Sequence, residues 1–166
     1  AFMYKKNKLN KFVIIMPMAG RGMRFKKYGI DTPKPLIKIN NLPMFAASAM
    51  AFSQKFKWFF IVQKIVTNNK IFKKSLKFFK NKKIVILNKY TNGQASTVGK
   101  VIKYLTKNQT IIVHSCDLYF KINFVEIKKK LKKYDIIVLS AQGKEYNFKN
   151  STQFSWVRKN YNNNKV

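Results

Sequence analysis

Five short apolar runs recur along the chain, separated by longer stretches in which apolar residues have helical spacing. The runs are nearly unbroken and rich in β-branched residues, a pattern typical of strands that are buried on both faces. They cover residues 12–18, 58–63, 83–88, 110–116 and 135–141. Between them we expect helices over roughly 43–56, 69–81, 94–107 and 121–133. Asn68 and Asn92 could cap two of these helices. The alternation predicts an α/β fold, a three-layer α/β/α Rossmann-like domain with a mainly parallel sheet.

The predicted topology also indicates where a ligand would bind. In open α/β sheets, ligands bind beyond the carboxyl ends of the strands. This rule selects residues 19–24 after the first run, 89–95 after the third and 115–119 after the fourth. Near the end of the chain, residues 153–166 predict a strand, an Asn-rich turn and the start of another strand.

Composition limits the class of protein. With 166 residues and 46% hydrophobic residues, the chain is expected to be one globular domain. Its 35 Lys and Arg residues against 5 Asp and Glu residues give a formal charge of +30, which attracts polyanions. This charge is spread along the whole chain and comes almost entirely from lysine, whereas base readout mostly uses arginine. Binding to nucleic acid is therefore left open but not favoured.

The single cysteine, Cys116, and the single histidine, His114, exclude several chemistries. One cysteine can form neither an intrachain disulfide nor a cysteine-based zinc cluster. Neighbouring residues on a strand point to opposite faces, so we expect His114 in the core or at a strand end rather than paired with Cys116. No segment approaches the ~20 apolar residues of a membrane span, and the first apolar run is short and interrupted by Pro17. We therefore expect a cytoplasmic protein with no membrane partner.

The segment AGRGMR, residues 19–24, has features of a phosphate-binding loop. Gly20 and Gly22 allow a tight turn that brings backbone N–H groups close to a phosphate. The segment is neither a Walker A loop nor a dinucleotide fingerprint, because the required lysine and third glycine are missing. Arg21 and Arg24 are two of only three arginines in a chain with 32 lysines, and the planar, forked guanidinium of arginine matches phosphate oxygens. We therefore expect an anion site in this loop.

Three further pieces follow in order along the chain. The segment TPKPLI, residues 32–37, places Lys34 between two prolines on a stiff, extended segment. The segment TNGQASTVG, residues 91–99, has Gly93 and the Gln94 amide where they could face a nucleobase edge. Asp117 follows the fourth apolar run and could hold Mg²⁺ against a substrate phosphate, or simply cap the next helix.

This order of strand, GxGxR, PKPL, Gly-Gln-Ala loop and strand-end aspartate resembles the sugar-phosphate nucleotidyltransferases. The resemblance extends over residues 12–166 and is closest to the type encoded with bacterial surface-polysaccharide genes. It implies an enzyme that joins a nucleoside triphosphate to a sugar 1-phosphate and releases pyrophosphate. Catalysis would then rest on positioning and charge stabilisation, since a phosphate oxygen needs no histidine base to attack phosphorus.

The resemblance also implies roles for individual residues. The loop residues Ala19, Gly20 and Gly22 would bind the triphosphate. Arg24 would stabilise charge on the leaving pyrophosphate, and Lys34 would neutralise the reacting phosphates.

The remaining implied roles concern the base and the metal. Gly93 and Gln94 would contact the base, and Asp117 would bind the catalytic Mg²⁺, the one cofactor that the resemblance implies. Arg21 occupies the variable position of the loop, and we expect it only to be exposed to solvent.

Two departures from the family pattern shape these expectations. Met18 and Ala19 stand where two glycines are common, and Met23 stands where threonine is frequent, which indicates a subtype. Family members usually continue beyond this length, with a Glu-Lys pair and a second metal-binding aspartate. We therefore expect residues 1–166 to be a single nucleotidyltransferase domain that lacks its C-terminal acceptor-binding part.

Three alternatives stay open. The first is a cytidylyltransferase that uses phosphocholine or a polyol phosphate. The second is a non-catalytic module that binds nucleotides or RNA. The third is a truncated protein that keeps the fold without activity.

Overall fold

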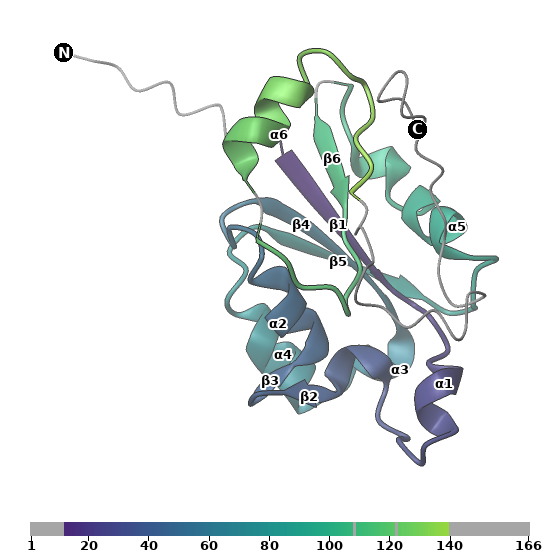
Figure 1. Cartoon of the computed structure of the whole chain (residues 1–166). Helices are drawn as coiled ribbons and strands as arrows, with labels where there is room; N and C mark the ends of the chain where they lie inside the picture. Colours follow the sequence, from purple (N-terminus) through teal and green to yellow (C-terminus); the bar gives the residue numbers. More distant parts are fainter. Residues whose placement is uncertain (1–11, 108, 122, 140–166) are drawn as a thin grey trace. The chain divides into compact units, whose positions relative to one another are not determined.

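A computed structural model describes residues 12–107, 109–121 and 123–139 (Figure 1). The chain divides into two compact units, residues 1–122 and 123–166. All the site residues named above lie in the first unit. The strand-turn-strand expected over residues 153–166 lies outside the described residues.

A parallel sheet forms the centre of the first unit (Figure 1). Its four strands have the order β5-β4-β1-β6, with the bounds β1 Phe12–Met18, β4 Lys57–Gln63, β5 Lys82–Leu87 and β6 Thr110–Val113. The two central strands contain the longest apolar runs and are buried along almost their whole length. A continuous apolar run suits this position because helices cover both faces of the strand.

Aromatic side chains fill the space between one face of the sheet and two helices, α2 Met44–Ala49 and α4 Lys70–Leu76. Phe45 of α2 packs edge-on against Phe60 of β4, with ring centroids 5.8 Å apart, and lies 5.2 Å from Phe72 of α4. Trp58 stacks on Phe60 at 5.4 Å. All four rings are fully buried, so each contributes about 150–250 Å² to the core on this face.

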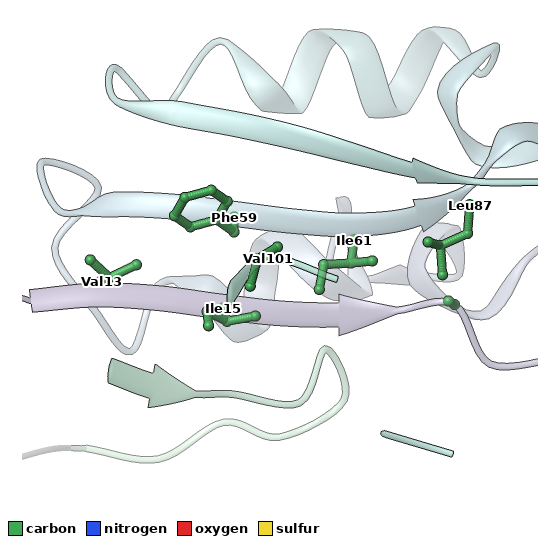
Figure 2. Close-up of a cluster of buried hydrophobic side chains, with 7 residues drawn as sticks. Val13, Ile15, Phe59, Ile61, Leu87 and Val101 are labelled. Atoms are coloured by element: carbon green, nitrogen blue, oxygen red, sulfur yellow. The ribbon is translucent and has the colours of Figure 1, made fainter. Parts of the chain in front are cut away.

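The opposite face is covered by α5 Gln94–Gly99 and the 3₁₀ helix η3 Ile102–Tyr104. Figure 2 shows the core on this side, in which Val101 packs against side chains of β1 and β4. The buried members are Val13, Ile15, Ala19, Phe59, Ile61, Leu87 and Val101. Side chains of a strand alternate between faces, so Val13 and Ile15 point into this layer while Ile14 and Met16 point towards α2 and α4.

Short elements connect the strands. They are α1 Met23–Lys26, the 3₁₀ helix η2 Lys34–Leu36, the hairpin of β2 Lys38–Ile39 and β3 Leu42–Pro43, and α3 Lys64–Thr67. The hairpin turns at Asn40 and Asn41, whose φ values of 45° and 66° are left-handed. Asparagine tolerates this conformation better than most residues, as a two-residue hairpin turn requires.

Both expected helix caps were displaced by one residue. Asn69, not Asn68, caps α4, and its side chain accepts hydrogen bonds from the backbone N–H groups of Ile71 and Phe72. Asn68 instead ends α3, an element that the sequence pattern did not predict. Gly93, not Asn92, is the N-cap of α5.

The second unit is described over residues 123–139. It contains α6 Phe124–Lys130, whose N-cap Asn123 accepts hydrogen bonds from two backbone N–H groups of the first turn. The strand expected over 135–141 was wrong for its described part, because residues 135–139 pair with no described strand. Residues 140–141 lie outside the described part.

No helix in the described ranges is long and apolar enough to cross a membrane.

Candidate active site

A cavity of about 500 Å³ lies at the carboxyl end of the parallel strands in the first unit. Three loops and η2 line it, and the loops are those that follow β1, β5 and β6. The lining residues are 17–21, 34–35, 90–92, 94, 97 and 115–116. Each segment that the strand-end rule selected therefore contributes to one space.

The loop after β1 offers backbone donors. Within the described residues, the backbone N–H groups of Gly20, Arg21 and Gly22 donate to no other group of the protein. Gly22 has φ of 65°, and a Cβ atom there would lie 3.6 Å from the Cβ of Lys34. Glycine is thus favoured by the left-handed backbone, whereas the space beside Lys34 would admit a Cβ atom in ordinary contact. A loop with several available N–H donors is suited to bind phosphate oxygens.

The two arginines of this loop take different positions. Arg21 lines the cavity, and its guanidinium lies over the ring of Tyr90, 4.9 Å from the centroid. Arg24 belongs to the short helix α1 and is not among the residues that line the cavity. Arg21 is exposed, as expected, but it also bridges the loops after β1 and β5. Sequence reasoning missed this contact, because nothing in the segment 89–95 indicates that Tyr90 lies against the loop after β1.

Lys34 and Asp117 form an ion pair beside the cavity, with 2.5 Å between Nζ and Oδ2. Ser115 donates its hydroxyl hydrogen to the other carboxylate oxygen of Asp117. Burial opposes ionisation of Asp117, but the hydrogen bonds from Lys34 and Ser115 outweigh it and hold the pKa below its ordinary value. Asp117 itself stands just outside the cavity lining, whereas Lys34 and Ser115 belong to it. The structure thus brings together two residues that lie 83 positions apart.

The loop before α5 is held by its own threonines. Gly93 has φ of 95°, and its carbonyl oxygen accepts hydrogen bonds from the hydroxyls of Thr91 and Thr97 at 3.3 and 3.0 Å. Gln94, the first residue of α5, lines the cavity with an exposed side chain, while Gly93 does not line it. Of the two residues predicted to contact the base, Gln94 therefore lines the cavity, whereas Gly93 determines the conformation of the loop.

Gln63, at the end of β4, was also missed. Its side-chain N–H₂ group lies 3.5 Å from the carbonyl oxygens of Ala19 and Lys89, which follow β1 and β5. These are long contacts, and each is at most a weak hydrogen bond. A polar residue at the carboxyl end of a central strand was the available signal, because strand ends in this fold face the ligand.

Neither His114 nor Cys116 is poised for proton transfer or nucleophilic attack. Burial raises the pKa of the Cys116 thiol to about 11, so the unreactive protonated form dominates at neutral pH. Burial lowers the pKa of His114, whose ring is 2% exposed and bonds to Ser48. The expected core role of His114 is confirmed.

No protein-family model matches the chain, and no curated protein matches it. Solved structures do match. A nucleoside-diphosphate-sugar pyrophosphorylase from Vibrio cholerae RC9 has a TM-score of 0.57 and 26% identity, over 69% of this chain and 52% of that chain.

Two further solved structures share the fold at lower identity. The protein Rv0371c from Mycobacterium tuberculosis H37Rv has a TM-score of 0.51 and 13% identity, and the match covers 74% of this chain and 60% of the Rv0371c chain. A nucleotidyl transferase from Methanothermobacter thermautotroptrophicus has a TM-score of 0.51 and 15% identity, over 65% of this chain and 51% of its own. This chain spans about half to three fifths of the length of these structures. It has the α/β fold that these solved structures share.

Proposed function

We propose that this chain carries the nucleotide site of a nucleotidyltransferase that joins a nucleoside triphosphate to a sugar 1-phosphate and releases pyrophosphate. One observation carries the proposal: Gly20 and Arg21, with available backbone N–H groups, line the same cavity at the carboxyl end of the sheet as Lys34, which is paired with Asp117. The order of motifs in the sequence and the likeness to the Vibrio cholerae pyrophosphorylase support the same reaction.

The loop after β1 would hold the triphosphate. The N–H groups of Gly20 and Gly22 would donate to its oxygens, with Ala19 at the base of the loop. Arg24 would reach the leaving pyrophosphate when the nucleotide is bound, and Lys34 would neutralise charge at the α-phosphate. Because these donors are fixed before the reaction, little reorganisation accompanies the development of charge.

The reaction is an in-line displacement at the α-phosphorus. An oxygen of the sugar phosphate attacks, a new P–O bond forms, and the bond to pyrophosphate breaks with its electron pair leaving on oxygen. The attacking oxygen is already deprotonated at neutral pH, so no general base is needed. A buried, neutral His114 and a protonated Cys116 are compatible with this chemistry.

Asp117 is the residue proposed to hold Mg²⁺. The described residues contain no group of three or more His, Cys, Asp or Glu side chains that could enclose a metal. One carboxylate is nevertheless compatible with Mg²⁺, which proteins often bind through one or two carboxylates together with substrate phosphates. A bound Mg²⁺ would supply charge neutralisation at the phosphates. Each oxygen of Asp117 accepts one hydrogen bond, and a carboxylate oxygen has two lone pairs, so each could still donate a lone pair to a metal.

Base recognition is assigned to the loop after β5. Gln94 offers an amide donor and acceptor to the edge of a base, and Gly93 keeps the loop in the shape that exposes it. Tyr90 adds an aromatic face at the same side of the cavity. The alternative of cytidine triphosphate with phosphocholine or a polyol phosphate as acceptor stays open, and these compounds belong in the test.

The test is pyrophosphate release from each of the four nucleoside triphosphates with a panel of sugar 1-phosphates, phosphocholine and polyol phosphates. Binding of each triphosphate is measured in parallel by calorimetry. We expect one triphosphate to bind with a preference of at least about tenfold and to release pyrophosphate with one class of acceptor. No release with any pair, combined with tight and salt-dependent RNA binding, would support a non-catalytic binding module instead. Triphosphate binding without release would refute the proposed activity for this chain.

A further inference from the structure

The loop that carries Asp117 is held from its buried side by Ser48 of α2. Ser48 is 3% exposed, and its hydroxyl oxygen lies 2.8 Å from the carbonyl oxygen of Ser115 and 2.5 Å from that of Leu118. These two carbonyl groups flank Asp117 on both sides in the sequence. A single buried hydroxyl therefore joins the two ends of the turn whose exposed side holds the carboxylate.

His114 fixes the direction in which this hydroxyl donates. Its Nε2 atom lies 2.8 Å from the hydroxyl oxygen of Ser48 and 3.2 Å from the carbonyl oxygen of Ser48. A carbonyl oxygen only accepts, so Nε2 carries a hydrogen and donates to both oxygens. The hydroxyl of Ser48 thus accepts from His114, and its single hydrogen is shared between the carbonyl oxygens of Ser115 and Leu118.

Aromatic packing reinforces the same contact. Phe52, four residues after Ser48, packs edge-on against the His114 ring at 4.7 Å. Phe120 lies 5.5 Å from the same ring and 6.2 Å from Phe52. Both ends of the segment 114–120 are therefore in contact with Ser48 of α2 or with Phe52 in the turn that follows this helix.

The same helix is bonded to the segment of Lys34. The backbone N–H of Met44, the first residue of α2, donates to the carbonyl oxygen of Ile37 at 2.8 Å, just after η2. Both members of the Lys34–Asp117 pair thus lie on segments that α2 supports.

We propose that Ser48 is a positioning residue that sets the Asp117 carboxylate against Lys34 through the carbonyl groups of Ser115 and Leu118. Its effect on the reaction rests on the proposed function, whereas its effect on the loop does not. A buried serine elsewhere in the unit, Ser75 of α4, is 5% exposed and provides a matched control.

The first test follows the loop itself. Backbone ¹⁵N relaxation is measured for the wild type, Ser48→Ala and Ser75→Ala. We expect the order parameters of residues 115–118 to fall from about 0.85 towards 0.6 or below in Ser48→Ala alone. Unchanged values in a folded Ser48→Ala variant would overturn the proposal. If Ser48→Ala does not fold, Ser48→Cys keeps the size with a weaker donor, and a smaller decrease is expected there.

The second test follows turnover. We expect Ser48→Ala to lower kcat about ten- to hundredfold, while KM for the triphosphate changes less than about threefold. In an Asp117→Asn background the same substitution should have little further effect, because Ser48 acts through Asp117. Full additivity of the two losses would contradict the proposal. A wild type that releases no pyrophosphate would refute the proposed function, and the relaxation test would still decide the role of Ser48.

Discussion

Arg21 and Arg24 lie three positions apart, yet only Arg21 lines the cavity. Lysine at either position keeps the positive charge but loses the planar guanidinium, whose two parallel N–H donors match phosphate oxygens. We expect Arg24→Lys to lower turnover strongly without loss of fold, because the proposed role of Arg24 is to donate hydrogen bonds as charge develops on pyrophosphate. We expect Arg21→Lys to raise the dissociation constant of the triphosphate about two- to fivefold with kcat unchanged, since the contact over Tyr90 is weakened.

These two variants are compared by steady-state kinetics and calorimetry, with Tyr90→Phe as a control that keeps the ring. Equal turnover in Arg24→Lys and the wild type would show that the arginine fork is not used in catalysis. A loss of kcat in Arg21→Lys would instead transfer that role to the arginine that faces the cavity.

The Lys34–Asp117 pair links stability to pH. The folded state lowers the pKa of Asp117 below its ordinary value of 3.8, so the pair stabilises the folded state above that pH. The contribution is lost as pH falls from about 3.8 through the lowered folded value. We expect Lys34→Met to raise the pKa of Asp117 and to reduce the decrease in unfolding free energy below pH 4. Urea unfolding between pH 3 and pH 7 measures this, and identical pH profiles for both proteins would contradict it.

Asp117→Asn tests the metal. The amide keeps the shape of the side chain but removes the charge that would hold Mg²⁺. We expect residual pyrophosphate release to be independent of Mg²⁺ concentration over the range that activates the wild type. A variant that Mg²⁺ still activates would place the metal on other residues. Circular dichroism and the melting temperature check that the fold is kept.

At the scale of elements, the N-terminus of α5 depends on Gly93. Its φ of 95° is unfavourable for any other residue, although a Cβ atom there would meet nothing within 4 Å. We expect Gly93→Ala to lower the free energy of unfolding by about 1–3 kcal/mol through backbone strain alone. Gly99, the last residue of the same helix, has no positive φ and equally open space. Gly99→Ala should therefore be neutral or stabilising by up to about 1 kcal/mol, and urea unfolding of both variants compares them.

The elements that the sequence predicted best are the buried central strands. The runs at 12–18 and 58–63 match β1 and β4 within one residue, because short, unbroken apolar runs with β-branched residues suit strands covered on both faces. The helices were predicted too long. Residues 50–56, expected as the end of a helix, form turns that still bury Phe52 and Phe56. Periodicity shows that these rings are buried but not that the backbone has left the helix.

The candidate site was predictable to the level of its loops. The strand-end rule and the motif order located residues 19–24, 89–95 and 115–119. The rule could not reveal which side chains meet across loops, because the contacts of Arg21 with Tyr90 and of Ser48 with Leu118 join residues about 70 positions apart. Such contacts follow from tertiary packing, and no local pattern around Ser48 distinguishes it from other helix serines.

At the scale of the whole molecule, the formal charge of +30 dominates. Lys34–Asp117 and the exposed Lys130–Glu126 are ion pairs. With 5 Asp and Glu residues against 35 Lys and Arg residues, most of the positive charge cannot be balanced by a carboxylate of the chain. The resulting positive field attracts any anion, including a triphosphate and RNA.

Salt dependence separates this general attraction from specific binding. Exposed charges more than about 8–10 Å from a bound anion are largely screened at physiological ionic strength, whereas groups that touch the phosphates are screened much less. We expect triphosphate binding to weaken only several-fold between about 0.05 and 0.5 M salt, and non-specific RNA binding to fall by orders of magnitude.

A matched pair of variants completes this test. Lys73 and Lys74 on the exposed side of α4 are absent from the cavity lining, and replacing both with glutamine removes charge without touching the site. We expect this double variant to lower the association rate of the triphosphate at low salt and to leave its affinity at about 0.15 M salt unchanged, while Lys34→Gln weakens binding at every salt concentration. Stopped-flow kinetics and calorimetry provide the two quantities. If the Lys73/Lys74 variant lost as much affinity at 0.15 M salt as Lys34→Gln, the spread charge rather than the cavity would be what binds the nucleotide.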